Sequence, residues 1–169
     1  MEQFESLIKE ATEQLAGPGA FLMTGEPGKT PNVMTIGWAQ WGRVWGKPIC
    51  EILVRTTRHS FSLLENNGLF TVSVPLNGAM KSELGVCGRV SGRDSNKVEQ
   101  LGLKLLPSRV GGIDALEGCT LHFECRVVAK SDMDPKMTDP AVMEQFYSPI
   151  EKNVLHRIYF GEILAAYRT

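Results

Sequence analysis

The chain has 169 residues, of which 43% are hydrophobic and 22% charged, a composition typical of one globular domain. With 18 basic and 19 acidic residues, the net charge of −1 gives no support for nucleic-acid binding. No apolar run approaches the roughly 20 residues that cross a membrane, and the acidic start at 1–5 is unlike a signal peptide. We therefore expect one cytoplasmic domain over residues 1–169 that binds neither nucleic acid nor membrane.

The four cysteines are predicted to be reduced. Cys50, Cys87, Cys119 and Cys125 show no C-x-x-C spacing, so no structural zinc site is expected. We interpret them as small buried hydrophobic residues. A redox or nucleophilic role for Cys87 is the less favoured alternative, because that residue lies beside a Gly-rich basic stretch.

The first half of the chain predicts a helix followed by strands. Phe4, Leu7, Ala11 and Leu15 share one helical face, and Gly17-Pro18-Gly19 ends the helix. Further along, we predict strands over 20–24, 33–38, 49–54 and 69–74, a helix over 60–66, and turn-rich loops over 26–31 and 40–48. Trp41 and Trp45, in the second loop, suggest a lid or a subunit contact.

The second half predicts short helices and two long strands. One or two helices lie over 79–106, the clearest over 96–101 with Ser95 or Asp94 as N-cap and Gly102 at its end. A strand over 119–128 alternates apolar and polar residues, which predicts one wet face carrying His122. Residues 131–153 form a loop with a helix near 141–146, and a strand over 155–167 has Gly161 as a bulge or close-approach point.

These elements amount to six or seven strands and three or four short helices that do not alternate regularly. A parallel doubly wound sheet is therefore disfavoured. We predict a mainly β fold, a mostly antiparallel barrel with helices at its ends.

Three stretches carry candidate chemistry. Residues 31–38 offer polar groups together with Met and Trp, which suit an aromatic ring; an ordinary strand is the alternative. Residues 55–60 place hydroxyls and basic groups at a predicted helix start, which suits a phosphate. Residues 88–97 form a Gly-rich basic turn without Walker A or Rossmann spacing. Capped or solvated surface turns are the alternatives for the last two, but their joint presence favours a phosphorylated ligand.

The order of these motifs resembles the flavin reductase-like, FMN-binding split-barrel family, and within it the flavoredoxin branch. The resemblance covers residues 20–167. It is carried by Asn32-Val33-Met34-Thr35, Thr56 to Ser60, Phe70 to Pro75, Cys87-Gly88-x-x-Ser91-Gly92-Arg93-Asp94-x-x-Lys97, Leu121-x-x-Glu124-Cys125 and Phe160-Gly161-Glu162-Ile163.

The resemblance implies an antiparallel six-stranded split β-barrel with Greek-key topology, a homodimer, and FMN held non-covalently near the subunit interface. Hydride or electrons would come from a nicotinamide nucleotide or a redox protein. The implied ring-bordering residues are Asn32, Met34, Thr35 and Trp38. The implied phosphate turn holds Arg55, Thr57, His59 and Ser60, and the second anchoring turn holds Ser91, Arg93 and Lys97. No catalytic residue is assigned, because the flavin itself carries the redox chemistry.

Several readings stay open beside an FMN-dependent oxidoreductase. They are a pyridoxamine-phosphate oxidase-like or other split-barrel flavoprotein, and a non-catalytic flavin-binding carrier or storage module. A barrel that has lost its cofactor is disfavoured by the joint presence of Asn32, Thr35, Ser60, Ser91 and Lys97. His156 is interpreted as lining a surface or a dimer contact.

Overall fold

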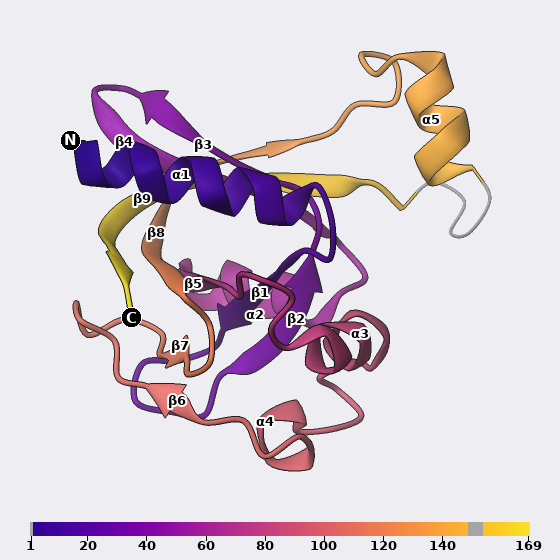
Figure 1. The fold of residues 1–169 in the computed structure, drawn as a ribbon. Helices are drawn as coiled ribbons and strands as arrows, with labels where there is room; N and C mark the ends of the chain where they lie inside the picture. The colour runs from indigo at the N-terminus through magenta and orange to yellow at the C-terminus, as the bar shows by residue number, and fades with distance from the viewer. Residues whose placement is uncertain (1, 149–153) are drawn as a thin grey trace.

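The computed structural model describes residues 2–148 and 154–169 and contains one large antiparallel sheet with short helices around it (Figure 1). The sheet has seven strands in the order β2-β1-β5-β8-β9-β4-β3. The elements are α1 (Glu2–Leu15), β1 (Ala20–Thr24), β2 (Asn32–Ile36), β3 (Ala39–Val44), β4 (Lys47–Arg55), α2 (His59–Asn67), β5 (Leu69–Val74), α3 (Lys81–Arg89), α4 (Lys97–Gln100), β6 (Leu105–Leu106), β7 (Ala115–Leu116), β8 (Leu121–Asp132), α5 (Pro140–Tyr147) and β9 (His156–Arg168).

The sheet curls around one apolar core. Ile36 on edge strand β2 belongs to the core cluster, and the partly buried Trp41 on the opposite edge strand β3 packs against it. In a flat sheet these edges would lie six strand spacings of about 4.8 Å apart. Leu7 and Ala11 of α1 are buried in the same cluster, so the N-terminal helix packs on the barrel as its apolar face predicts. The mainly β, antiparallel fold expected from the sequence is confirmed.

A second core covers the outer face of β1. Phe21 and Met23 alternate with Leu22 along the strand, and they pack outward against Leu84 of α3 and Val98 next to Lys97 in α4. Every residue of β1 is therefore buried, in contrast with a strand that has one wet face. This second core fixes α3 and α4 against the β1–β2 pair and so places the turn between them.

The prediction of a turn-rich loop over 40–48 is wrong. This segment contains the seventh strand of the sheet. Residues 39–44 form β3, which joins β4 through a tight turn at Trp45 and Gly46, both with positive φ. Two successive positive φ values suit a hairpin turn. Trp41 packs on Phe123 in the core with ring centroids 5.1 Å apart, so it is no lid, whereas Trp45 is 62% exposed.

The wet face predicted for residues 119–128 is also wrong. His122 and Glu124 are fully buried, and residues 108–110 cover Glu124 by donating to its carboxylate from the Ser108 hydroxyl and two backbone amides. Their polar atoms are satisfied inside the protein: His122 hydrogen-bonds Ser73 through Nδ1 (3.1 Å), and the Glu124 carboxylate accepts from the Tyr167 hydroxyl (2.8 Å). A polar alternation can thus indicate a covered hydrogen-bonding face as well as a solvated one.

Gly161 is the close-approach point that the sequence predicted. A Cβ there would lie 2.4 Å from Cζ of Phe70 and 3.0 Å from Cβ of Cys125. Glycine leaves the space in which Phe70 and Cys125 pack over β9, and a register irregularity in β8 lies alongside. Cys125 and the other three cysteines are buried free thiols, as expected.

We predict that Gly161→Ala destabilises the protein by about 1–3 kcal/mol through overpacking. The free energy of unfolding, measured by urea denaturation, tests this. The matched control is Gly42→Ala on β3, where an added Cβ meets nothing within 4 Å. Equal stability of the two variants would contradict the close-approach interpretation.

Candidate functional site

Two adjoining cavities collect the predicted site residues. The first, of about 220 Å³ and here named the anion cavity, is lined by Asn32, Met34, Thr57, Arg58, His59, Ser60, Cys87, Gly88, Val90, Ser91, Gly92, Arg93 and Lys97. The second, of about 200 Å³ and named the aromatic cavity, is lined by Met34, Thr35, Ile36, Gly37, Trp38, Leu53, Arg55, Arg58, Gly88 and His156. Met34, Arg58 and Gly88 line both, and all eleven predicted residues lie in one or the other.

The start of α2 forms one wall of the anion cavity. Its N-cap residue Arg58 has extended backbone and makes no capping hydrogen bond through its side chain. The first turn of a helix presents free N–H groups and a partial positive charge. Asn32 Nδ2 donates to Ser60 Oγ at 2.9 Å and so fastens β2 to this helix start.

Lys97 is the most unusual residue of the anion cavity. It follows Asn96, the N-cap of α4, whose side chain accepts from the amides of Val98 and Glu99; the predicted caps Ser95 and Asp94 are therefore wrong. Lys97 is 3% exposed, and its Nζ donates to Val90 O at 2.9 Å. Among the described residues no acidic side chain pairs with it, and burial lowers its pKa. A buried cation in this position is suited to an anionic ligand.

His59 adds a second unsatisfied group. Its Nδ1 is buried and has no hydrogen-bond partner in the described part of the chain. Burial lowers its pKa, and the positive charges of Arg93 and Lys97 lower it further. Arg93 is held in place by Nη1, which donates to Thr57 O at 2.9 Å. The cavity therefore gathers positive charge and an open hydrogen-bonding atom at one point.

The turn between α3 and α4 approaches β2 through Gly92. A Cβ at Gly92 would lie 1.8 Å from Asn32 Oδ1 and 2.9 Å from His59 Cδ2. Only glycine lets the turn come this close, so the two basic stretches predicted from the sequence form one cavity wall.

The rings of Trp38 and His156 together form one side of the aromatic cavity. Trp38 is 38% exposed and touches Phe146 edge-on, with ring centroids 5.3 Å apart, and the imidazole of His156 at 4.9 Å. The Thr35 hydroxyl donates to Leu84 O at 2.7 Å, so it fastens β2 to α3. A flat ligand resting here would meet Met34 and Trp38 as its apolar contacts.

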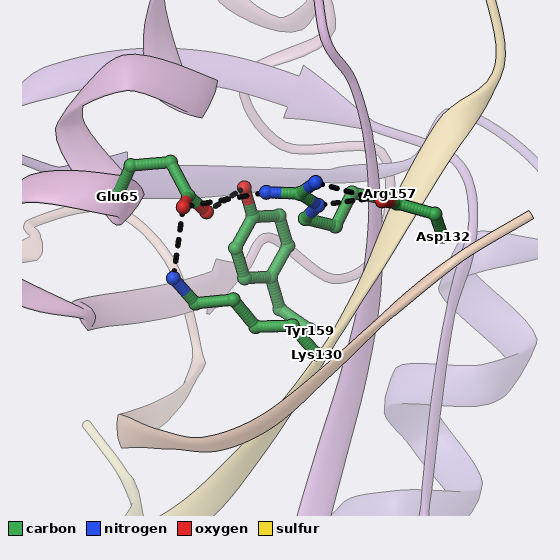
Figure 2. A network of polar contacts seen from close by, with 5 residues as sticks. All are labelled: Glu65, Lys130, Asp132, Arg157 and Tyr159. Carbon is green, nitrogen blue, oxygen red and sulfur yellow. Dashed lines mark hydrogen bonds and ion pairs between the residues drawn. The ribbon is translucent and has the colours of Figure 1, made fainter.

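A polar network behind the site ties α2 to the long strands (Figure 2). Glu65 of α2 accepts from Lys130 Nζ (2.9 Å) on β8 and from the Tyr159 hydroxyl (2.8 Å) on β9. Arg157 binds Asp132 with two hydrogen bonds of 2.6 and 2.8 Å and contacts Glu65 at 3.3 Å. The helix whose start lines the anion cavity is thereby fixed to the strand that carries His156.

Comparison with known proteins identifies the family. Residues 13–168 match the model of the flavin reductase like domain. The chain belongs to this family. The resemblance predicted from the sequence is therefore confirmed.

Solved structures of this fold include two flavoredoxins. That of Methanosarcina acetivorans is 25% identical with a TM-score of 0.64, covering 89% of this chain and 67% of its own. That of Desulfovibrio vulgaris (Miyazaki F) is 18% identical with a TM-score of 0.66, covering 89% and 68%. An NADH:FAD oxidoreductase of Streptomyces globisporus C-1027 is 17% identical with a TM-score of 0.66, covering 89% and 74%.

A curated relative covers less of the chain. An uncharacterized protein of Archaeoglobus fulgidus is 32% identical over 98 residues, which are 58% of this chain. The match spans about half of that relative's length, 54%. Within the described residues, no helix is long and apolar enough to cross a bilayer.

This member of the flavin reductase like family has site residues that its sequence did not reveal. His156, expected at a surface or dimer contact, is buried and hydrogen-bonded through Nδ1 to the Tyr147 hydroxyl at 2.8 Å. Burial lowers its pKa to about 4, and Arg55 and Arg58 lower it as well. Tyr147 and Phe146 come from α5, and no local sequence pattern connects that segment to residue 38.

Cys87 lines the anion cavity but is not prepared for reaction. Burial raises the pKa of its thiol, while the charge of Lys97 opposes this increase. Since the thiolate is the reactive form, a nucleophilic role has no support from this geometry.

We predict that stability falls as the pH drops from 6.5 toward 4. His122 and His156 both have pKa values lowered to about 4 in the folded protein, against 6.5 when unfolded. The unfolded chain therefore binds more protons in this window, and stability, which is complete above pH 6.5, declines by up to about 3 kcal/mol for each histidine. Urea denaturation at several pH values measures the slope. His156→Gln is expected to reduce it, and an unchanged slope would refute the assignment to this histidine.

Proposed function

We propose that the chain is an FMN-binding oxidoreductase that passes hydride or electrons between a nicotinamide nucleotide or a redox protein and an acceptor. The observation that carries the proposal is Lys97, a buried lysine without an acidic partner among the described residues, beside the unpartnered Nδ1 of His59. A phosphate monoester would supply the missing negative charge and several acceptor oxygens.

The residues present fit a flavin phosphate. The start of α2 offers backbone N–H groups, and the hydroxyls of Ser60 and Ser91 line the same cavity. Lys97 would bind the phosphate as a charge, while Arg93 stays near it through its hydrogen bond to Thr57. Gly92 keeps the wall of the cavity close enough for these groups to reach one ligand.

The aromatic cavity would receive the flavin ring. It joins the anion cavity through Met34, Arg58 and Gly88, so one molecule with a phosphate at one end and a flat ring at the other can fill both. Bound flavin supplies the hydride and electron transfer itself. The chain's part would be to bind and orient it: Trp38 and Met34 would contact the ring, and Arg55 and Arg58 would supply positive charge nearby.

The named relatives support this redox assignment. Flavoredoxins and an NADH:FAD oxidoreductase share the fold, and one structure of the latter holds NAD and FAD fragments. We propose FMN because the anion cavity collects the phosphate-binding groups at one point. A non-catalytic electron carrier or storage module is the alternative function, since it needs the same cavity.

We also propose that the flavin-binding unit spans the whole chain, acts as a homodimer and works in a reducing, cytoplasmic compartment. Four buried free thiols support the compartment. The exposed Trp45, which rests against Phe160 at 5.9 Å between ring centroids, supports an apolar subunit contact. Sedimentation of the purified protein would test the dimer.

The visible spectrum of the purified protein, recorded anaerobically after incubation with FMN, tests the function. We expect flavin bands shifted by binding and bleached by NADH or NADPH. Bands that persist with both nucleotides but bleach with a redox protein would identify a carrier. Absence of binding would overturn the cofactor assignment.

We predict that Lys97→Met weakens FMN binding by about 1–3 kcal/mol, the scale of a charge-assisted hydrogen bond. Riboflavin, which lacks the phosphate, should bind the variant and the wild type equally. The free variant should be no less stable than the wild type, because it no longer buries an unpaired charge. Fluorescence titration measures both affinities, with Lys104→Met, at an exposed lysine, as control. An unchanged FMN affinity would contradict the placement of the phosphate in this cavity.

A further inference from the structure

The segment bearing α5 extends away from the barrel and then places Tyr147 against Trp38 and His156, two residues that line the aromatic cavity. The helix projects from the far ends of β8 and β9 (Figure 1), and most of it is exposed. Its last residue, Tyr147, is only 3% exposed. Arg55 fixes this end twice, since Nη2 donates to Phe146 O at 3.0 Å and the guanidinium lies 5.5 Å from the centre of the Tyr147 ring.

The Tyr147 hydroxyl has two neighbours and a single hydrogen. It lies 2.8 Å from His156 Nδ1 and 3.2 Å from Met133 Sδ. If the hydroxyl donates to the sulfur, it can accept from an Nδ1–H, and both contacts are hydrogen bonds. If it donates to Nδ1 instead, the sulfur receives nothing. The chain Nδ1–H to Oη–H to Sδ therefore makes one more hydrogen bond than the alternative, the additional one to the weak thioether acceptor.

The charges around His156 keep its ring neutral. Two cations act on the imidazole, Arg55 at the end of β4 and Arg58 before α2. Its aromatic neighbours are uncharged: Tyr147 comes from α5, and the ring of Trp38 comes from the turn between β2 and β3. The adjacent Arg157 is paired with Asp132 and Glu65. Burial and these two cations lower the pKa of His156, so the ring is neutral near pH 7 and carries a single N–H.

We propose that Tyr147 is a positioning residue that holds His156 as the neutral Nδ1–H tautomer, so that Nε2 accepts a hydrogen bond from a ring N–H of the ligand in the aromatic cavity. The identity of that ligand rests on the proposed function, because an oxidised flavin carries one imide N–H at N3. The tautomer is a property of the chain alone and can be measured without ligand.

Long-range ¹H–¹⁵N spectra of histidine rings test the tautomer in the ligand-free protein. The chain has three histidines, so His156→Gln assigns the signal. We expect Nδ1 of His156 to be protonated and Nε2 unprotonated between pH 6 and 8. Tyr147→Phe should shift the ring toward Nε2–H. Tyr167→Phe, which loses a hydroxyl bound to Glu124 instead, is the matched control and should leave the signal unchanged.

Two outcomes of this experiment overturn the proposal. One is an Nε2–H tautomer in the wild type, and the other is an unchanged tautomer in Tyr147→Phe.

Paired titrations with FMN and N3-methyl-FMN test the ligand contact. The wild type should prefer FMN by about 3–10-fold, the range of one hydrogen bond, and this ratio should approach one in His156→Gln and fall in Tyr147→Phe. The phosphate is common to both ligands, and a purely steric effect of the methyl group would persist in every variant. Equal ratios in all three proteins overturn the contact. Failure of FMN itself to bind refutes the proposed function, and the tautomer result then stands or falls by itself.

Discussion

The burial of β1 on both faces is the constraint on which the site depends. One face of this strand closes the barrel core, and the other supports α3 and α4 through Phe21 and Met23. Since β2 pairs with β1, the turn after α3 is brought against Asn32, and Lys97 enters a cavity whose other wall is the start of α2. The two basic stretches are far apart in sequence. They come together because strand β1 contributes residues to both cores.

The residues of the anion cavity lower the stability of the fold that holds them. Within residues 2–148 and 154–169, the buried Lys97 has no carboxylate partner and His59 has an unpartnered ring nitrogen, and both cost folding free energy. The cost is tolerated because the surrounding elements are held by apolar packing and by the Glu65 network. A ligand that neutralises the charge stabilises the folded state by an amount that grows with the logarithm of its concentration relative to its dissociation constant.

The residues that local pattern could identify were those in turns and helix starts. Residues 55–60 and 88–97 combine basic, hydroxyl and glycine residues at element boundaries, and the structure brings them together. The misjudged residues depend on distant partners. Glu124 is buried under residues 108–110, and His122 is buried between Ser73 and Thr169. Residues 39–44 form a strand whose Trp41 reaches the core. The pairing of Tyr147 with His156 joins segments that no periodicity relates.

The network around Glu65 has a consequence for how the molecule opens. His156 and Arg157 are consecutive on β9, and Arg157 is anchored to α2 and β8 while His156 lines the aromatic cavity. Local unfolding of α2 would therefore release the start of β9 with it, and the two ends of the site form one cooperative unit. Amide hydrogen exchange in α2 and in the first residues of β9 then proceeds through a common opening, with a ligand at either cavity slowing exchange at both.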